Sequence, residues 1–395
     1  MSEDSATKPI LVDRRSLMNL LPDPGTERFR QEVRAWLEEN VPSEPRPVGW
    51  SPDAAAFDRE WQRTQFDGGW AGIAWDAEYG GRGLPLLEQV IWYEELVRAG
   101  APRPSIFNVA ISHAGPTLIM RGDERQKAFH LPLILRGDTP WCQGFSEPGA
   151  GSDLASLSTR GVVDGDAIVV TGQKIWTSYA QYADYCELLV RTDPAAGKHK
   201  GITWLILDMH LPGIDVRPIT SLDGHPHNCE VFLDEVRVPL ANVVGEVDNG
   251  WSVAMSTLAA ERGPGFLDSR LSQIAIVEEL IASASENGLI AEEAIADRLA
   301  RARASAAALR SMAYFQISSA ADGTQPGPET TAIRAFYVQT ALETAQLGMD
   351  ILNTSALEWS SATERWLAAF SEPIAGGTID ILRNIIGERV LGLPR

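Results

Sequence analysis

The chain has 395 residues, 44% of them apolar, so it can bury a substantial core over two or three structural units, which excludes a largely disordered protein. A formal net charge of -19 argues against a nucleic-acid surface, because phosphate binding needs concentrated Lys and Arg. The three cysteines are too few and odd in number for a disulfide framework, and they fit a reducing compartment.

The N-terminal stretch MSEDSATKPILVDRR opens with acids and has no long apolar run, so it lacks the layout of a secretory signal. No uninterrupted apolar run approaches the ~18 residues that span a bilayer. We therefore expect a soluble cytoplasmic protein with neither membrane nor nucleic acid as a partner.

Helical periodicity follows at the N-terminal end. Between positions 27 and 40, Phe29, Val33 and Leu37 recur with the spacing of one buried helix face, and Thr26 is placed to cap its start. Several prolines break this pattern after Val41. Helical character returns from about 54 to 68 and from 86 to 99.

The middle of the chain changes to the period of strands. The runs 160–163 and 167–171 flank Asp164 and Gly165, a strong signal for a hairpin turn. Further strands are expected in three places, at 185–192, 201–207 and 230–238.

Long helices are predicted to resume from Trp251. They cover 251–283 and 290–320, separated by the sequence Glu286, Asn287 and Gly288. A polar, Pro- and Gly-rich segment at 321–328 separates the next pair of helices. A final helix at 377–390 follows from apolar residues at helical spacing, with Asp380 as an acid near its positive end.

This order of elements predicts an α+β fold in three domains, an N-terminal helical domain over 1–140, a central β domain over 141–246 and a C-terminal helical bundle over 247–395. A β unit inserted between helices leaves a cleft suited to a large planar cofactor. A structural helical protein with a β insertion is the alternative reading of the same order.

Two segments of the middle region carry ligand-binding signals. The segment WCQGFSEPGAGSD at 141–153 has glycines and Ser/Asp after a proline, which let backbone amides approach an oxygen-rich ligand. The same composition is also typical of an ordinary tight loop. The second segment, GQKIWTS at 172–178, follows a strand, and its Trp can cover one face of a planar ring while hydroxyls and backbone N–H groups bond polar atoms at the ring's edge. A lone Trp at such a place is also typical of core packing.

Both segments resemble those of the acyl-CoA dehydrogenase family, and the resemblance runs from the Gly-rich loop at 78–83 through 234–239 to the final LGLPR. It implies an acyl-CoA dehydrogenase-like fold with a central antiparallel β-barrel-like domain, a C-terminal four-helix bundle, and FAD held without a Rossmann fold. By resemblance the flavin side is formed by Gln143, Phe145, Ser146, Trp176, Thr177, Ser178, Gly377 and Thr378. The substrate side is formed by Ser152, Arg262 and Gly376.

The reaction that the resemblance implies is α,β-desaturation of an acyl-CoA thioester, in which a shielded carboxylate removes the α-proton and the β-hydride goes to flavin N5. Many relatives carry the base immediately before the C-terminal Gly-Thr pair, where this chain has Gly376. Isovaleryl- and long-chain-type relatives carry it on another helix, and Glu261 occupies that place. We therefore predict that Glu261 is the catalytic base, and a solvated pair with Arg262 at a helix kink is the competing interpretation.

The surroundings of Glu261 suit a bulky ligand. Pro264 would distort a helix there, and several small residues leave space for a branched or polycyclic acyl group. Arg262 either holds this neighbourhood in place or positions the thioester. The amide of Gly376, with a flavin ribityl hydroxyl, would assist at the thioester oxygen, as in the family.

Two family motifs on the FAD side are reduced in this chain. The arginine motif that relatives use to clamp the pyrophosphate of a neighbouring subunit is replaced by the sequence 283–288, and the adenine-side glycine loop is reduced to the sequence 346–350. These departures resemble those of relatives built from two different subunits, so we expect a homo- or hetero-oligomer, a dimer or tetramer. An electron-transfer flavoprotein is the expected electron acceptor.

Three readings of function therefore stay open. The first is a dehydrogenase, the second a noncatalytic or FAD-sharing partner subunit, and the third a flavin oxidase or monooxygenase on the same fold. The sequence HPHNC at 225–229 contains ligand types for a metal, but no second cluster completes a set, so we predict a polar loop and no metal.

Overall fold

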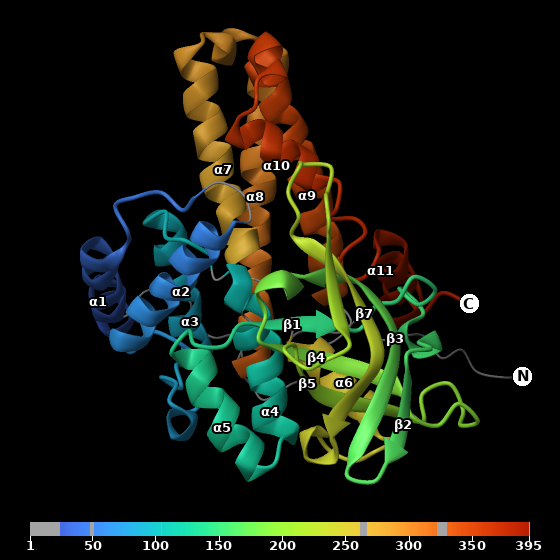
Figure 1. The fold of residues 1–395 in the computed structure, drawn as a ribbon. Coiled ribbons are helices and arrows are strands. Elements are labelled where there is room, and N and C mark those ends of the chain that lie inside the picture. The colour runs from blue at the N-terminus through green and yellow to red at the C-terminus, as the bar shows by residue number, and fades with distance from the viewer. Residues whose placement is uncertain (1–23, 48–50, 104, 261–266, 322–329, 395) are drawn as a thin grey trace, which may run out of the picture.

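The computed structural model describes residues 24–47, 51–103, 105–260, 267–321 and 330–394. Figure 1 shows helices from the N-terminal part of the chain beside a curled sheet from its middle, and long C-terminal helices that project beyond both. The predicted α+β order of helices, sheet and helices is confirmed.

Among the described residues, five α-helices form the N-terminal part. They are α1 (Pro24–Asn40), α2 (Pro52–Asp67), α3 (Leu86–Arg98), α4 (Gly115–Arg121) and α5 (Glu124–Leu135), with short helices η1 (Ala77–Tyr79), η2 (Ser105–Phe107) and η3 (Ala110–Ala114). The buried face predicted for α1 is confirmed at Val33 and Leu37. The cap predicted at Thr26 is wrong, because the helix already begins at Pro24, whose fixed φ suits a first helical position.

A seven-stranded sheet forms the middle part. Its strands are β1 (Trp141–Gly144), β2 (Arg160–Asp164), β3 (Ala167–Ser178), β4 (Tyr185–Arg191), β5 (Ile202–Asp208), β6 (Ile214–Ile219) and β7 (Asn228–Pro239), in the order β1-β4-β2-β3-β7-β6, with β5 paired to β4. The predicted hairpin is confirmed, since Asp164 pairs with Ala167 and Gly165 has a φ of 62° in the turn. Short helices η4 (Leu154–Ser156), η5 (Ala180–Tyr182) and η6 (Leu240–Asn242) lie between or after strands.

The sheet is mainly antiparallel but mixed. The β2–β3, β3–β7, β4–β5 and β6–β7 pairings are antiparallel, whereas β1 runs parallel to β4. The parallel register places Gln143 directly beside Glu187. Two polar side chains from distant parts of the sequence therefore project from neighbouring strands.

The C-terminal part contains the remaining helices. They are α6 (Gly250–Ala260), α7 (Leu267–Glu286), α8 (Glu293–Ala321), α9 (Thr330–Leu352), α10 (Ser361–Ala369) and α11 (Ile379–Ile385), with η8 (Leu289–Ala291), η9 (Asn353–Leu357) and η10 (Ile386–Val390). The break predicted before η8 is confirmed, and Gly288 there has a φ of 73°. The helix expected over 251–283 is described as α6 and α7, and nearly all of the expected polar separator at 321–328 lies outside the described residues.

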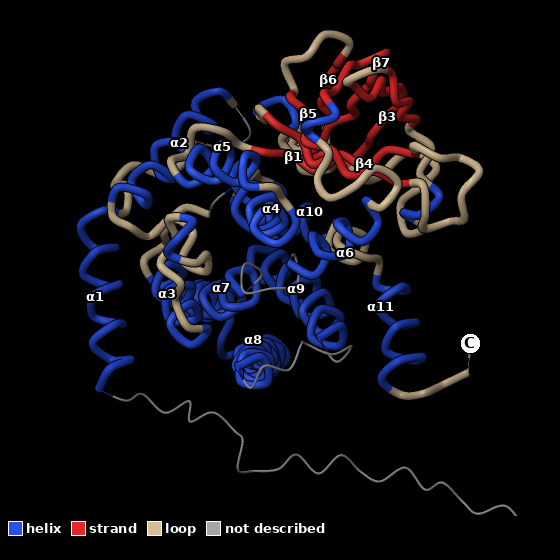
Figure 2. The backbone as a smooth tube through the Cα atoms, turned by 90° about the horizontal axis from the view of Figure 1, so that it is seen from below, coloured by secondary structure: helices blue, strands red, loops and turns tan. Residues whose placement is uncertain are grey.

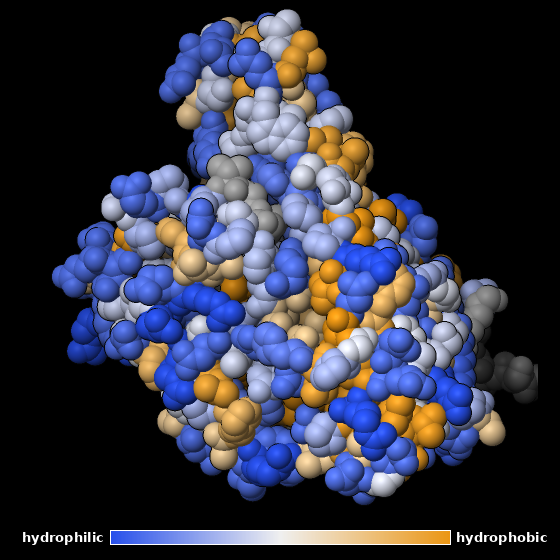
Figure 3. All heavy atoms as spheres, in the orientation of Figure 1, coloured by the Kyte–Doolittle hydropathy of each residue, from blue (hydrophilic) through white to orange (hydrophobic). Residues whose placement is uncertain are grey.

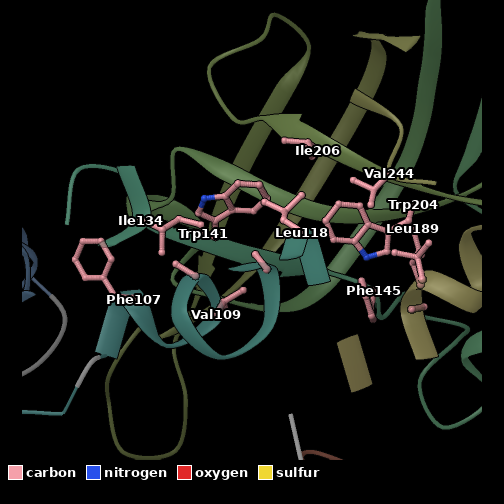
Figure 4. Close-up of a cluster of buried hydrophobic side chains, with 14 of the residues drawn as sticks. Phe107, Val109, Leu118, Ile134, Trp141, Phe145, Leu189, Trp204, Ile206 and Val244 are labelled. Atoms are coloured by element: carbon pink, nitrogen blue, oxygen red, sulfur yellow. The ribbon is translucent and has the colours of Figure 1, made fainter. Parts of the chain in front are cut away.

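One apolar cluster joins all three parts of the chain. It combines Phe107, Leu118 and Ile134 from the N-terminal part with buried residues of the sheet and of α6. Figure 4 shows side chains of this cluster from the N-terminal helices and the sheet facing one another. The view from below in Figure 2 shows the strands gathered on one side and α6 lying between the sheet and α9. The region around α6 is therefore a junction of the three parts.

Candidate functional site

The two sequence segments that signalled ligand binding lie side by side. The carbonyl of Ser146, just after β1, accepts a hydrogen bond from the backbone N–H of Ile175 in β3 at 3.0 Å. This bond fixes the loop after β1 against the strand that carries Trp176. The structure thus brings together residues about thirty positions apart in the sequence.

A buried ion pair anchors this loop. The Lys174 ammonium, with none of its side chain exposed, donates to Glu147 Oε1 at 2.8 Å and to the Phe145 carbonyl at 3.2 Å. The Glu147 carboxylate also accepts the backbone N–H groups of Ser158 and Thr159. Burial alone would raise the pKa of Glu147, but the charge of Lys174 and these hydrogen bonds lower it to about 2.

Trp176 departs from ordinary strand geometry. Its φ is 60°, a left-handed value that is rare for a bulky residue, and it lies in a register shift between Lys174 and Thr177. Trp176 is 59% exposed although the strand around it is largely covered. An exposed aromatic ring held in a strained bulge is a feature that clusters at ligand sites.

The two residues after Trp176 carry hydroxyls with different surroundings. Thr177 is fully buried, and its Oγ1 has no hydrogen-bond partner among the described residues. Ser178 donates from its hydroxyl to Asn228 Oδ1 at 3.1 Å on the neighbouring strand. A buried hydroxyl without a partner is costly, but protein atoms already cover Thr177 Oγ1, so a ligand could bond to it only by displacing them.

A polar cluster lies beneath this region. The Gln143 amide donates to Glu187 Oε1 at 2.8 Å, and Glu187 is fully buried; His113 Nδ1 lies 3.3 Å from the same amide and 3.5 Å from the carboxylate. His113 belongs to η3, a π-helical segment that runs directly into α4. Such segments are frequent at functional sites.

Sequence reasoning identified Gln143 but missed its two partners. The signal that could have found Glu187 is a lone acid in the apolar strand YCELLVR, since buried carboxylates need a specific reason. Phe145, predicted to face a flavin, is packed in the shared apolar cluster and is nearly fully buried.

Ser152 lies at the exposed end of the loop that Glu147 anchors. Its neighbour Asp153 forms a surface ion pair with Lys198 at 2.8 Å. The loop therefore presents polar side chains at its tip while its base is fixed by buried contacts.

The turn before α11 contains the glycines of the C-terminal signature. Gly376 and Gly377 have φ values of 62° and 93°, a conformation that favours glycine, and Thr378 caps α11 by accepting from Ile381 N at 3.2 Å. Asp380 lies in the first turn of α11, as predicted. No hydrogen bond or ion pair between described residues joins this turn to β3.

Glu261 and Arg262, the predicted base and its neighbour, lie outside the described residues. The helix that leads to them is well fixed. α6 packs on β5, α4 and η3, and its buried Thr257 receives a hydrogen bond from Thr117 Oγ1 at 2.9 Å. The chain thus reaches position 261 from a helix that contacts the segment carrying His113.

The HPHNC sequence forms contacts with η5 and α10. His225 Nε2 lies 3.2 Å from Glu364 Oε1, and Cys229 Sγ donates to Gln181 Oε1 at 2.9 Å. Across the described ranges, no three His, Cys, Asp or Glu side chains gather in a group that could hold a metal ion. Within those same ranges, no helix combines the length and hydrophobicity that a membrane crossing requires.

Three family models match the chain in succession. They are the N-terminal domain of acyl-CoA dehydrogenase over residues 23–138, its middle domain over 142–236 and its C-terminal domain over 248–391. Proteins of this family are FAD-dependent oxidoreductases.

Curated relatives and solved structures agree with these matches. The chain is 36% identical over 380 residues to "Acyl-CoA dehydrogenase IpdE1" of Mycobacterium tuberculosis, covering 93% of this chain and 98% of the relative. The structure titled "Tcur3481-Tcur3483 steroid ACAD" is similar at 32% identity with a TM-score of 0.85, covering 96% of this chain and 100% of that one. The ChsE4-ChsE5 complex from Mycobacterium tuberculosis contains a chain similar at 33% identity with a TM-score of 0.81, covering 96% and 100%.

The matches extend along almost the whole chain, and their three domains follow the order of helices, sheet and helices that the structure shows. The chain belongs to the acyl-CoA dehydrogenase family and is an oxidoreductase of that family.

Proposed function

We propose that this chain binds FAD and desaturates an acyl-CoA thioester between its α and β carbons, with Glu261 as the base. The observation that carries the FAD assignment is the exposed Trp176 in a left-handed bulge of the strand that also carries Thr177 and Ser178. A flat heterocycle with polar edges would cover this exposed ring.

The residues proposed to hold FAD fit that role. Trp176, Thr177 and Ser178 lie on one strand, and Ser146 is joined to that strand by the bond to Ile175. Gly377 and Thr378 would contribute from the turn before α11. When bound, FAD supplies the acceptor for the β-hydride.

The other chemical tasks fall to side chains and amides of this chain. The Glu261 carboxylate would take the α-proton, and shielding from water would raise its proton affinity toward the range useful for this step. The Gly376 amide would donate to the thioester oxygen as negative charge develops there. Ser152, at the exposed tip of its loop, is proposed to face the CoA side.

The base assignment is supported by the end of α6. Thr257, four residues before Glu261 in the sequence, is tied to α4, and α6 contacts the sheet and η3, where the N-terminal and middle parts meet. The described chain therefore leads up to position 261 from the junction of the three parts.

Anaerobic mixing of the flavin-loaded protein with a panel of acyl-CoA thioesters tests the function. We expect the visible flavin band to bleach with the correct substrate, and Glu261→Gln to lose the bleaching while retaining bound FAD. Unchanged bleaching in Glu261→Gln would exclude it as the base. If the wild-type protein binds FAD but none of the thioesters in the panel bleaches the flavin band, the dehydrogenase assignment is contradicted.

We further propose a bulky, polycyclic acyl group as the substrate class. The sequence near Glu261 is rich in small residues, Ala259, Ala260, Gly263 and Gly265, and a similar structure is titled a steroid ACAD. Activity confined to short straight acyl-CoA thioesters would contradict this.

Assembly with a second, different subunit is also proposed. The FAD-side motifs at 283–288 and 346–350 are reduced, and two of the similar structures carry paired names, Tcur3481-Tcur3483 and ChsE4-ChsE5. An electron-transfer flavoprotein would reoxidise the flavin. If the bleaching depended on a carboxylate of the partner and not on Glu261, this chain would have a noncatalytic role. Rapid reaction of the reduced flavin with oxygen would instead identify an oxidase.

A further inference from the structure

The turn that contains Gly376 is held by one arginine of α9. Arg334 donates from Nη2 to the Ala375 carbonyl at 3.3 Å and to the Glu372 carbonyl at 3.1 Å, and from Nη1 to the Glu372 carboxylate at 2.8 Å. A single guanidinium thus makes three contacts with the four-residue stretch before Gly376. Its planar fork of donors is suited to such multiple bonding.

The Glu372 carboxylate is fixed from a second side. The Tyr337 hydroxyl, one turn further along α9, donates to Glu372 Oε1 at 3.2 Å, and the Arg334 guanidinium lies over the Tyr337 ring at 5.1 Å. Tyr337 is itself buried. The turn is therefore attached to a packed helix and not only to its own backbone.

One of these contacts determines a direction. The Ala375 carbonyl and the Gly376 N–H belong to the same peptide unit, and in a planar trans peptide these two groups point in opposite directions. A carbonyl drawn toward Arg334 therefore turns the Gly376 N–H away from α9. Gly376 and Gly377 have φ values of 62° and 93°, a left-handed conformation that favours glycine, and the contacts with Arg334 help to hold the turn in it.

We propose that Arg334 is a positioning residue that orients the Gly376 N–H toward the thioester oxygen of the substrate. This inference rests on the proposed function, because it takes the Gly376 amide as the donor to that oxygen. Arg334 itself does not touch the substrate in this scheme. It acts by holding the peptide unit whose other end does.

Substitution of Arg334 in the flavin-loaded enzyme, with its partner subunit if FAD binding requires one, tests the proposal. We expect Arg334→Met to lower kcat about tenfold or more while KM changes by less than about threefold, because an amide aimed at developing charge acts in the transition state. Arg334→Lys keeps the charge but not the fork, so partial recovery is expected. Tyr337→Phe, which leaves both carbonyl contacts in place, should stay close to wild type.

A spectroscopic probe separates orientation from general damage. A conjugated aryl-enoyl-CoA absorbs at longer wavelength when its thioester carbonyl accepts a hydrogen bond, and we expect this red shift in wild type and in Tyr337→Phe but not in Arg334→Met. Arg303→Met, which removes an exposed arginine paired with Glu278, is the matched control and should retain both the shift and kcat.

The outcomes are decisive for each claim. Arg334→Met with bound flavin, a full red shift and kcat within about twofold of wild type overturns the positioning role. If Arg334→Met does not retain FAD, the same two measurements on Arg334→Lys decide, and wild-type values there overturn the role. If none of the acyl-CoA thioesters bleaches the flavin of the wild-type enzyme, the proposed function is contradicted instead. The red shift of the aryl-enoyl-CoA then still reports on the orientation of the Gly376 amide.

Discussion

Thr177 combines two properties that seldom occur together at one residue. Its side chain is fully buried, and among the described residues its hydroxyl has no partner. This hydroxyl therefore opposes folding. Its removal should not lower the stability of the protein.

We predict that Thr177→Val leaves the free energy of unfolding of the FAD-free protein unchanged or slightly higher, because it removes a buried hydroxyl that has no partner among the described residues. It should change the Kd for FAD by less than about threefold, because the side chain has no exposed surface for FAD to contact. Urea unfolding and flavin titration measure the two quantities.

The matched control is Thr203→Val in β5. Thr203 is equally buried, but its hydroxyl contacts Thr192 Oγ1 at 2.7 Å and accepts from Asp248 N at 2.9 Å. This substitution should lower stability by about 1 kcal/mol and leave FAD affinity unchanged. A lower stability in Thr177→Val, with unaltered FAD affinity, would show that its hydroxyl has a structural role.

At the scale of elements, the loop after β1 depends on the Lys174 and Glu147 pair. Removing one partner of a buried ion pair leaves the other charge without compensation. We predict that Lys174→Met lowers the free energy of unfolding by about 3–5 kcal/mol, measured by chemical denaturation. It should also weaken FAD binding, because Ser146 and Trp176 are positioned from both sides of this pair.

Lys198→Met provides a comparison within the same region. Lys198 and its partner Asp153 are both more than half exposed, and surface pairs contribute about 0–1 kcal/mol. A loss for Lys174→Met no larger than that for Lys198→Met would refute the anchoring role of the buried pair.

The elements that the sequence predicted well are those with an unbroken period. The hairpin around Gly165 and the strands over 185–192 and 201–207 are of this kind, and the structure differs from them by a residue at their ends. β3 was predicted only to Thr171, because the bulge between Lys174 and Thr177 interrupts the alternation. β6 lies at the edge of the sheet and contains Pro218. Within sheets proline occurs mainly in edge strands, and here it obscures the alternation of apolar and polar residues that predicts a strand.

Site residues that lie in family motifs could be predicted from the sequence. Site residues that meet only through contacts between distant segments could not. Gln143 and Trp176 stand in recognisable segments. Glu187 joins Gln143 only through the parallel register of β1 and β4, and no local pattern encodes that pairing. Arg334 lies about forty residues before the turn that it holds, so its contact also follows from the fold alone.

At the scale of the molecule, large apolar side chains are exposed on the segment 357–393 of the C-terminal part. They are Leu357, Trp359, Phe370, Ile374, Ile381, Val390, Leu391 and Leu393. Figure 3 shows hydrophobic side chains in several patches on one face, including the projecting helices. Exposed apolar groups of this size are candidate contacts for another protein chain.

Ile374 and Leu391 are 68% and 65% exposed in the single chain. We predict that Ile374→Asp and Leu391→Asp each weaken subunit association about tenfold or more, since a charge in an apolar interface is poorly solvated. Light scattering after size exclusion, over a range of concentrations, measures the assembly.

Phe129→Asp is the control, because Phe129 is also more than half exposed but lies on α5 in the N-terminal part. An assembly that Phe129→Asp disrupts and the other two substitutions leave intact would place the subunit contact on the N-terminal helices instead.

The apolar cluster that joins the three parts has a consequence for synthesis on the ribosome. Phe107 and Leu118 leave the ribosome about 150 residues before Val253 and Ala254, which help to cover the same cluster. At about 5–20 residues per second, this interval lasts roughly 10–30 s. During that time the nascent N-terminal helices expose apolar side chains that the finished protein buries, so this chain should be a client of ribosome-associated chaperones. Codon choices that slow translation between these positions should raise its aggregation in cells.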